Sequence, residues 1–144
     1  METVLVGSDH AGFGLKTLIK ERLENQGYVV IDVGCLSEVS CDYPVFAIDL
    51  CKAIQKGDAP RGILVCGTGI GMSMTANRMK GIRAALCANE YQARMSRAHN
   101  DSNVLCLGSR VLGQDLAFSI LDVWLKTQFE SGRHKRRVDL IESI

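Results

Sequence analysis

The sequence predicts an α/β fold: one five-stranded parallel sheet covered by helices on both faces, a three-layer sandwich of Rossmann-like type. Two observations lead to this class. Short apolar runs without polar alternation recur along the chain, which is typical of parallel strands that are buried on both faces. Segments whose apolar residues repeat at helical spacing separate these runs, and such regular alternation of strands and helices is characteristic of α/β folds.

The first half of the chain shows this alternation from its start. Residues 3–8 form an apolar run that predicts a strand, and helical spacing follows at Leu15, Leu18, Ile19 and Leu23. Residues 28–33 are short and rich in β-branched side chains, which indicates a second strand. Asp42 is a suitable cap for the next helix, whose expected inner face carries Ala47, Leu50, Cys51 and Ile54.

The second half continues the pattern and ends on a basic helix. The expected elements are, in order, a strand over 62–66, a helix over about 69–78, a strand over 82–87, a helix over 89–98, a strand over 103–107, a long helix with an apolar face made by Ala117, Ile120, Leu121 and Trp124, and a short helix from near Arg133. No repeat or linker interrupts the series, so we expect residues 1–144 to form a single domain.

Composition argues against several classes of function. Lys and Arg number 17 against 16 Asp and Glu, a balance that gives no support for binding nucleic acid or an anionic membrane surface. No apolar stretch approaches the ~20 residues of a membrane span, and no leader precedes the first strand, so we expect a cytoplasmic protein. The six cysteines form no C-x-x-C pair and the three histidines do not cluster, so we expect free thiols and no metal site.

The third strand brings a thiol to a glycine-rich loop. Its apolar run ends on Cys66 and is followed at once by Gly67, Thr68, Gly69, Ile70 and Gly71. Glycines leave backbone N–H groups uncovered, and a helix N-terminus adds partial positive charge, so this loop can hold an anion or a developing oxyanion and favours the thiolate. A base beside oxyanion donors indicates an enzyme that moves a proton next to a carbonyl.

Other polar residues are expected at the same edge of the sheet. Ligands bind outside the carboxyl ends of parallel strands, where Asp9 and His10 follow the first strand and Arg110 follows the fifth. His99 and Asn100 precede the fifth strand and therefore belong to the opposite edge, as does the basic helix. These groups would reach the thiol only from a partner subunit, and a two-fold homodimer would form two equal sites.

The basic helix indicates the substrate class. Arg133 and Arg137 are four residues apart and share one helix face, where two guanidinium groups suit a phosphate dianion. The alternatives are a solvated basic face, a Cys66 that is only a core residue, and an Asp9 that only caps a helix. A dinucleotide site is disfavoured, because the glycine spacing and its place after the third strand differ from the dinucleotide-binding pattern.

Six blocks of this chain carry a resemblance to a known family. The blocks are Ser8-Asp9-His10-Ala11-Gly12, Asp42-Tyr43-Pro44, the segment from Cys66 to Gly71, the segment from Ser96 to Leu105, Gly108-Ser109-Arg110, and Gly132-Arg133-His134 with Arg137. Together they resemble the type B family of ribose-5-phosphate isomerases, and the match runs in order over nearly the full length. The family includes isomerases of galactose 6-phosphate and allose 6-phosphate.

The resemblance implies interconversion of D-ribose 5-phosphate and D-ribulose 5-phosphate through an enediolate, without a metal or cofactor. Cys66 then moves the proton between C1 and C2, and Met72 places the chain in the branch that uses cysteine rather than glutamate as the base. His99 opens the sugar ring, and Asp9 binds a sugar hydroxyl or the ring oxygen. The remaining implied contacts are Thr68, Asn100 and the N–H groups of Gly67, Gly69, Ile70 and Gly71 on the enediolate, Tyr43 along the pocket, and His10, Arg110, Arg133 and Arg137 on the phosphate.

Three questions stay open at the level of sequence. A hexose 6-phosphate isomerase, acting on allose or galactose 6-phosphate, would carry the same catalytic residues. A phosphosugar-binding module without turnover would keep the arginines, although it could lose Cys66, Thr68 and His99. The homodimer with shared active sites could also be half of a tetramer.

Overall fold

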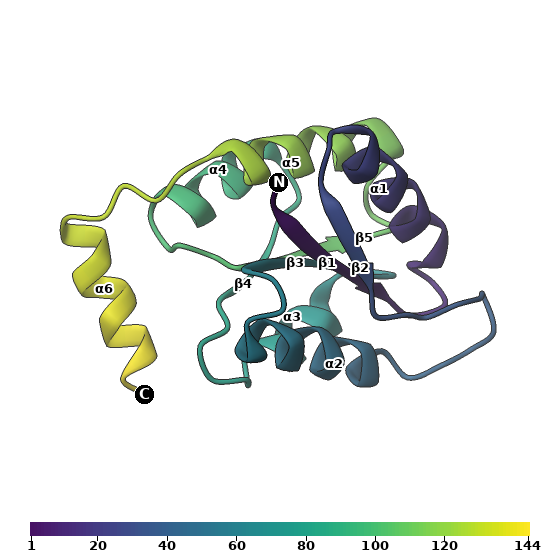
Figure 1. The fold of residues 1–144 in the computed structure, drawn as a ribbon, viewed down its shortest axis with the longest axis horizontal. Coiled ribbons are helices and arrows are strands. Elements are labelled where there is room, and N and C mark those ends of the chain that lie inside the picture. The colour runs from purple at the N-terminus through teal and green to yellow at the C-terminus, as the bar shows by residue number, and fades with distance from the viewer.

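Five strands form one sheet in which every neighbouring pair is parallel (Figure 1). The computed structural model describes all residues, 1–144. The expected parallel sheet is confirmed, with strands β1 (Thr3–Ser8), β2 (Val29–Asp32), β3 (Arg61–Cys66), β4 (Ala84–Leu86) and β5 (Val104–Gly108). Their spatial order is β2-β1-β3-β5-β4, so β1, β3 and β5 are adjacent at the centre.

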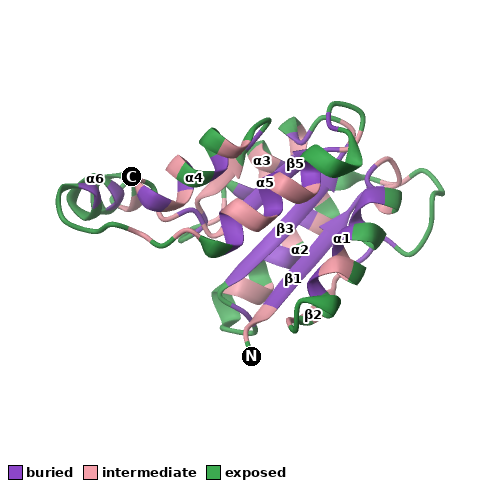
Figure 2. Ribbon diagram, turned by 90° about the horizontal axis from the view of Figure 1, so that it is seen from above, coloured by how far each residue is buried: buried purple, intermediate pink, exposed green.

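Helices cover both faces of this sheet and complete the expected three layers. The helices are α1 (Phe13–Asn25), α2 (Tyr43–Lys56), α3 (Ile70–Ala76), α4 (Glu90–Ala98), α5 (Gln114–Lys126) and α6 (Arg133–Glu142). Figure 1 shows α1, α4 and α5 on one side of the sheet and α2 and α3 on the other. Each side has its own apolar core, and β1 and β3 are buried almost along their whole length between the two cores (Figure 2).

Two expectations about individual helices are wrong. On α1 the buried positions include Lys16 in addition to Leu15, Ile19 and Leu23, whereas Leu18 is 36 % exposed. Lys16 can be buried because its ammonium reaches Asp32 of β2, so an ion pair that spans two elements overrides the polarity of the side chain. At the start of α2, Asp42 occupies the N-cap position but makes no capping hydrogen bond with its side chain.

The C-terminal helix α6 stands away from the three layers (Figure 1). It touches the rest of the chain through an ion pair between Glu142 and Arg83 at 2.6 Å and through the buried side chain of His134. Its apolar residues Leu140 and Ile141 are 60 % and 48 % exposed. A helix with exposed apolar residues and few contacts within its own chain has surface available for another partner.

The cysteines and the helix lengths agree with the remaining structural expectations. All six cysteines are free thiols, and only Cys41 is not buried. None of the helices combines the length with the apolar character that crossing a bilayer requires.

Candidate active site

Cys66 is the last residue of β3, and the glycine loop that follows bends back toward its sulfur. The backbone N–H of Gly69 donates a hydrogen bond to Cys66 Sγ at 3.1 Å, and an amide donor stabilises negative charge on sulfur. Gly69 has a φ of +79°, and a Cβ there would lie 2.5 Å from Leu86 Cδ1. Only glycine fits this position, so the loop that supplies the donor depends on it.

The segment after β1 lies against the end of β3. The N–H of Asp9 donates to the Val65 carbonyl at 3.3 Å, and the carboxylate of Asp9 accepts from the N–H of Gly12 at 3.0 Å. Asp9 is 6 % exposed. The carboxylate therefore stabilises the turn into α1, as the capping alternative requires, and its position beside β3 remains compatible with a sugar contact.

The segment after β5 joins the glycine loop from the other side. The N–H of Ser109 donates to the Cys66 carbonyl and the N–H of Arg110 to the Gly67 carbonyl, both at 2.9 Å. The Ser109 hydroxyl donates to the Ala11 carbonyl at 2.8 Å and so ties this segment to the one that follows β1. Arg110 also lies over the loop, since its Cδ and Nη1 are 3.4 Å from where a Cβ on Gly67 would stand.

His10 and Tyr43 complete the group that one chain brings together. The N–H of Cys41 donates to His10 Nδ1 at 3.2 Å, which leaves Nε2 as the nitrogen that carries the proton of the neutral ring. The Tyr43 ring packs against Gly71, where a Cβ would be 2.6 Å from Tyr43 Cε2. The contact between Cys41 and His10 was not predicted, because it joins residues 31 positions apart and no local pattern signals it.

Thr68 stabilises the glycine loop and does not form the wall of a buried pocket. Its hydroxyl accepts a hydrogen bond from the Ile70 N–H at 3.2 Å, and both side chains are exposed. The hydroxyl thus fixes the first turn of α3. This leaves the loop with an open outer surface at the edge of the sheet.

Four of the expected site residues do not reach Cys66 within one chain. His99 and Asn100 follow α4 and precede β5, and the nearby Asn103 carbonyl accepts from the N–H of Gly62 at the amino end of β3. Cys66 lies at the other end of that strand, four residues or roughly 13 Å away at the usual rise of a parallel strand. Arg133 and Arg137 are exposed on α6 and take part in no ion pair of this chain.

The expectation that the histidines do not cluster is wrong. His99 and His134 stack with ring centroids 4.1 Å apart and planes inclined by 9°. Glu130 Oε1 lies 3.8 Å from His99 Nε2 and 3.5 Å from His134 Nε2. Burial of the His134 ring lowers its pKa, and the neighbouring His99 and Arg133 lower it further, so His134 favours the neutral form.

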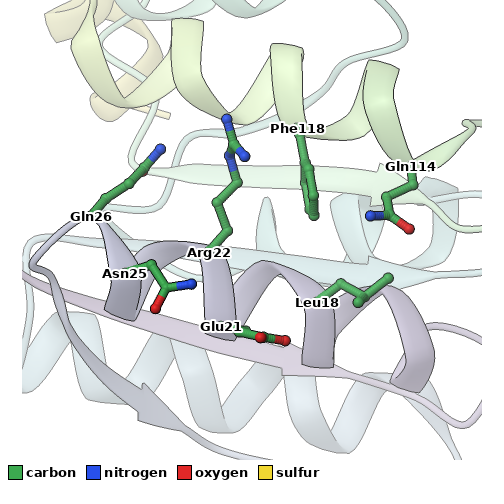
Figure 3. Close-up of a pocket in the computed structure, with 7 residues that line it drawn as sticks. All are labelled: Leu18, Glu21, Arg22, Asn25, Gln26, Gln114 and Phe118. Carbon is green, nitrogen blue, oxygen red and sulfur yellow. The ribbon is translucent and has the colours of Figure 1, made fainter.

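A groove of about 300 Å³ between α1 and α5 contains none of the expected site residues (Figure 3). Its most prominent cation, Arg22, is already paired with Asp122 at 2.6 Å and lies over the Phe118 ring at 4.7 Å. The residues that line the groove include no thiol and no histidine, and the edge around Cys66 remains the candidate site.

Comparison with known proteins identifies the family to which this chain belongs. The Ribose/Galactose Isomerase family model matches residues 4–141. The chain belongs to this family. Ribose-5-phosphate isomerase B of Escherichia coli (strain K12), a related protein, is 47 % identical over 144 residues, which cover 100 % of this chain and 97 % of that protein.

Solved structures of Ribose/Galactose Isomerase relatives share the fold. Ribose-5-phosphate isomerase B from Clostridium thermocellum superposes with a TM-score of 0.97 at 50 % identity and covers 98 % of this chain and 95 % of its own. The enzyme from Mycoplasma genitalium, solved with bound ribulose-5-phosphate, gives a TM-score of 0.93 at 41 % identity and covers 98 % of this chain and 94 % of its own.

Proposed function

We propose that this protein is an aldose-ketose isomerase that interconverts D-ribose 5-phosphate and D-ribulose 5-phosphate. The observation that carries the proposal is the Cys66 sulfur with the Gly69 N–H directed at it. Hydrogen bonds join the end of β3 and its glycine loop to the segments that carry Asp9 and Arg110. Membership of the Ribose/Galactose Isomerase family supports it, as does the bound ribulose-5-phosphate of the Mycoplasma genitalium relative. We expect this enzyme to act in the cytoplasm without a metal or cofactor.

The proposed chemistry is a proton transfer between adjacent carbons. The Cys66 thiolate removes the proton from C2 of the open-chain aldose, and the electrons of the C–H bond form the C1–C2 double bond while the C1 carbonyl oxygen gains negative charge. Thr68 and the N–H groups of 67–71 stabilise that oxygen. The sulfur then returns its proton to C1, the C2 oxygen becomes the carbonyl, and the proton of its hydroxyl passes to the C1 oxygen.

A second copy of the chain is needed to complete this site. We propose a homodimer, alone or within a tetramer, in which the partner contributes the residues that lie far from Cys66 in one chain. In that assembly His99 opens the sugar ring, Asn100 contacts the enediolate, and Arg133 and Arg137 join Arg110 and His10 on the phosphate. The exposed apolar residues of α6 support this arrangement, because a helix of this kind gains stability by packing on another subunit.

Replacement of the thiol tests the assignment of the base. Cys66→Ala should lower kcat by at least about a thousandfold while ribulose 5-phosphate still binds, because only the proton acceptor is removed. Cys51→Ala is the matched control, since Cys51 is a buried cysteine of the same apolar core and should leave turnover within a few-fold of the parent. Near-normal turnover of Cys66→Ala would remove Cys66 as the base.

Mixed dimers test the shared site. In a dimer of one Cys66→Ala chain and one His99→Ala chain, one site lacks both groups and the other is intact. Random 1:1 mixing therefore restores roughly a quarter of the parent activity from two inactive proteins. No recovery in heterodimers verified by mass spectrometry would contradict the arrangement. Arg137→Ala should mainly raise KM if this arginine binds phosphate.

A hexose 6-phosphate is the second candidate substrate, because the matching family model describes galactose as well as ribose isomerases. Turnover of ribose 5-phosphate, allose 6-phosphate and galactose 6-phosphate under identical conditions separates the two. We expect the highest kcat/KM for ribose 5-phosphate. A higher value for either hexose would reassign the substrate while leaving the role of Cys66 unchanged.

A further inference from the structure

Three potential metal ligands from different parts of the chain meet beside α6. His99 ends α4, Glu130 lies in the segment between α5 and α6, and His134 is in the first turn of α6. Their ligand atoms all lie within 4.8 Å of one another. In a tetrahedral site with bonds of about 2.0–2.2 Å, ligand atoms are roughly 3.3–3.6 Å apart. The two distances from Glu130, 3.5 and 3.8 Å, are already close to that spacing.

The mobility of two of the three side chains allows the remaining adjustment. The stacked rings are nearly parallel, so their in-plane lone pairs must tilt toward a common point. The side chains of His99 and Glu130 are 40 % and 58 % exposed and can rotate, whereas that of His134 is only 10 % exposed and is held in place. His134 thus acts as the fixed ligand to which the other two adjust.

The charges around the cluster select its ligand. Two neutral imidazoles and one carboxylate suit borderline divalent ions such as Zn²⁺ and Co²⁺. Arg133 and Arg137 add positive charge near the cluster, which opposes the binding of a cation. Glu130 supplies the one negative charge of the ligand set.

We propose that His99, Glu130 and His134 form a binding site for a divalent ion of the Zn²⁺ class, and that the bound ion reversibly inhibits the enzyme. The proposed binding of the ion rests only on the geometry of the cluster. The inhibitory part rests on the proposed function, because the ion takes the lone pair with which His99 would accept or return a proton during ring opening. No bond of the substrate changes in this step, and a chelator that removes the ion restores the imidazole.

The binding test uses Co²⁺, whose visible spectrum reports on its ligands. Titration of the full-length, EDTA-treated protein should show one Co²⁺ per chain without a thiolate charge-transfer band. Glu130→Gln and His134→Asn should each weaken binding by about tenfold or more. Asp139→Asn is the matched control, because it removes a carboxylate of α6 that is outside the cluster, and Cys41→Ser controls for the thiol 3.9 Å from His10. Both controls should bind like the parent.

The inhibition test measures ribose 5-phosphate turnover at rising Zn²⁺, each variant being compared with its own metal-free rate. The parent should lose activity and recover it with EDTA, and Glu130→Gln should need at least about tenfold more Zn²⁺ for half inhibition. Unchanged Co²⁺ affinity in both ligand variants, or a thiolate band that accounts for all binding, would overturn the site. Binding without inhibition would overturn the inhibitory part. A metal-free protein with no turnover would instead refute the proposed function, while the Co²⁺ titration still decides the site.

Discussion

Lys16→Met should remove one of the main polar contacts that hold the layers together. Lys16 belongs to α1, and its side chain is 2 % exposed. Its ammonium donates to Asp32 Oδ1 at 3.0 Å and to the Cys35 carbonyl at 2.6 Å, so it links the helix to the end of β2 and to the loop that leads toward Cys41. Methionine fills a similar volume with an apolar chain, so the substitution tests the charge rather than the packing.

The expected loss follows from the groups left behind. Removing one partner of a buried ion pair costs about 3–5 kcal/mol, because the other charge stays desolvated. Asp32 keeps a hydrogen bond from the Gly34 N–H and is 17 % exposed, which places the loss at the lower end, about 3 kcal/mol. For a chain of 144 residues this corresponds to a fall in Tm of roughly 6–12 °C.

Urea denaturation followed by circular dichroism measures this loss, with Lys20→Met as the control. Lys20 faces the same carboxylate at 4.0 Å, but its side chain is 41 % exposed. An exposed pair contributes only about 0–1 kcal/mol, so the control should unfold at nearly the parent concentration of urea. Equal losses for the two variants, or a loss below about 1 kcal/mol for Lys16→Met, would refute the reasoning from burial.

Three further predictions concern acid sensitivity, thiol reactivity and the glycine loop. Hydrogen bonding from the Arg22 guanidinium on α1 lowers the pKa of the Asp122 carboxyl. The contribution of the Asp122 carboxylate to stability is therefore complete above its ordinary pKa of 3.8 and is lost as the pH falls through its lower pKa in the folded state. Asp122→Asn should therefore be less stable than the parent at neutral pH, and the difference should shrink as the pH falls below 3.8; a deficit that stays constant in acid urea titrations contradicts this. Burial raises the pKa of Cys51 to about 12 and that of Cys87 to about 11. Iodoacetamide should therefore leave both thiols unmodified in the native protein at about pH 8. Peptide mass spectrometry that finds them alkylated as fast as in urea would disprove this protection. Gly69→Ala should destabilise the protein by about 2 kcal/mol or more, because the new Cβ adds a steric clash to the backbone strain of a positive φ. Gly57→Ala is the control, since its φ is +86° and no atom lies within 4 Å of the added Cβ, so it should show only the backbone strain. Equal losses for the two variants in thermal unfolding would exclude the clash.

The sequence located the part of the site that topology alone brings together. Cys66 ends β3, and Asp9 and Arg110 follow β1 and β5. The carboxyl ends of parallel strands share an edge, so the convergence of these residues needed no knowledge of side-chain packing. The contact between Cys41 and His10 could not be predicted in this way. The loop that carries Cys41 has no regular structure, and its path depends on hydrogen bonds made elsewhere in the fold.

The histidine cluster shows the same limit on the other side of the molecule. His99 and His134 are far apart in the chain, and spacing rules for metal ligands consider residues close in sequence. Their stacking depends on how the segment between α5 and α6 returns to the end of α4, where the Glu130 N–H donates to the Ala98 carbonyl at 3.0 Å. That path is a property of the folded chain.

The sequence by itself determined the alternation of strands and helices and the position of a thiol in front of a glycine loop. These features are local, because buried strands and amphipathic helices reveal themselves in the periodicity of neighbouring residues. Only the tertiary structure decided that Lys16 is buried while Leu18 is exposed, and that α6 stands apart from the sheet. The free energy of a charged side chain depends on partners from distant elements, and no local pattern contains that information.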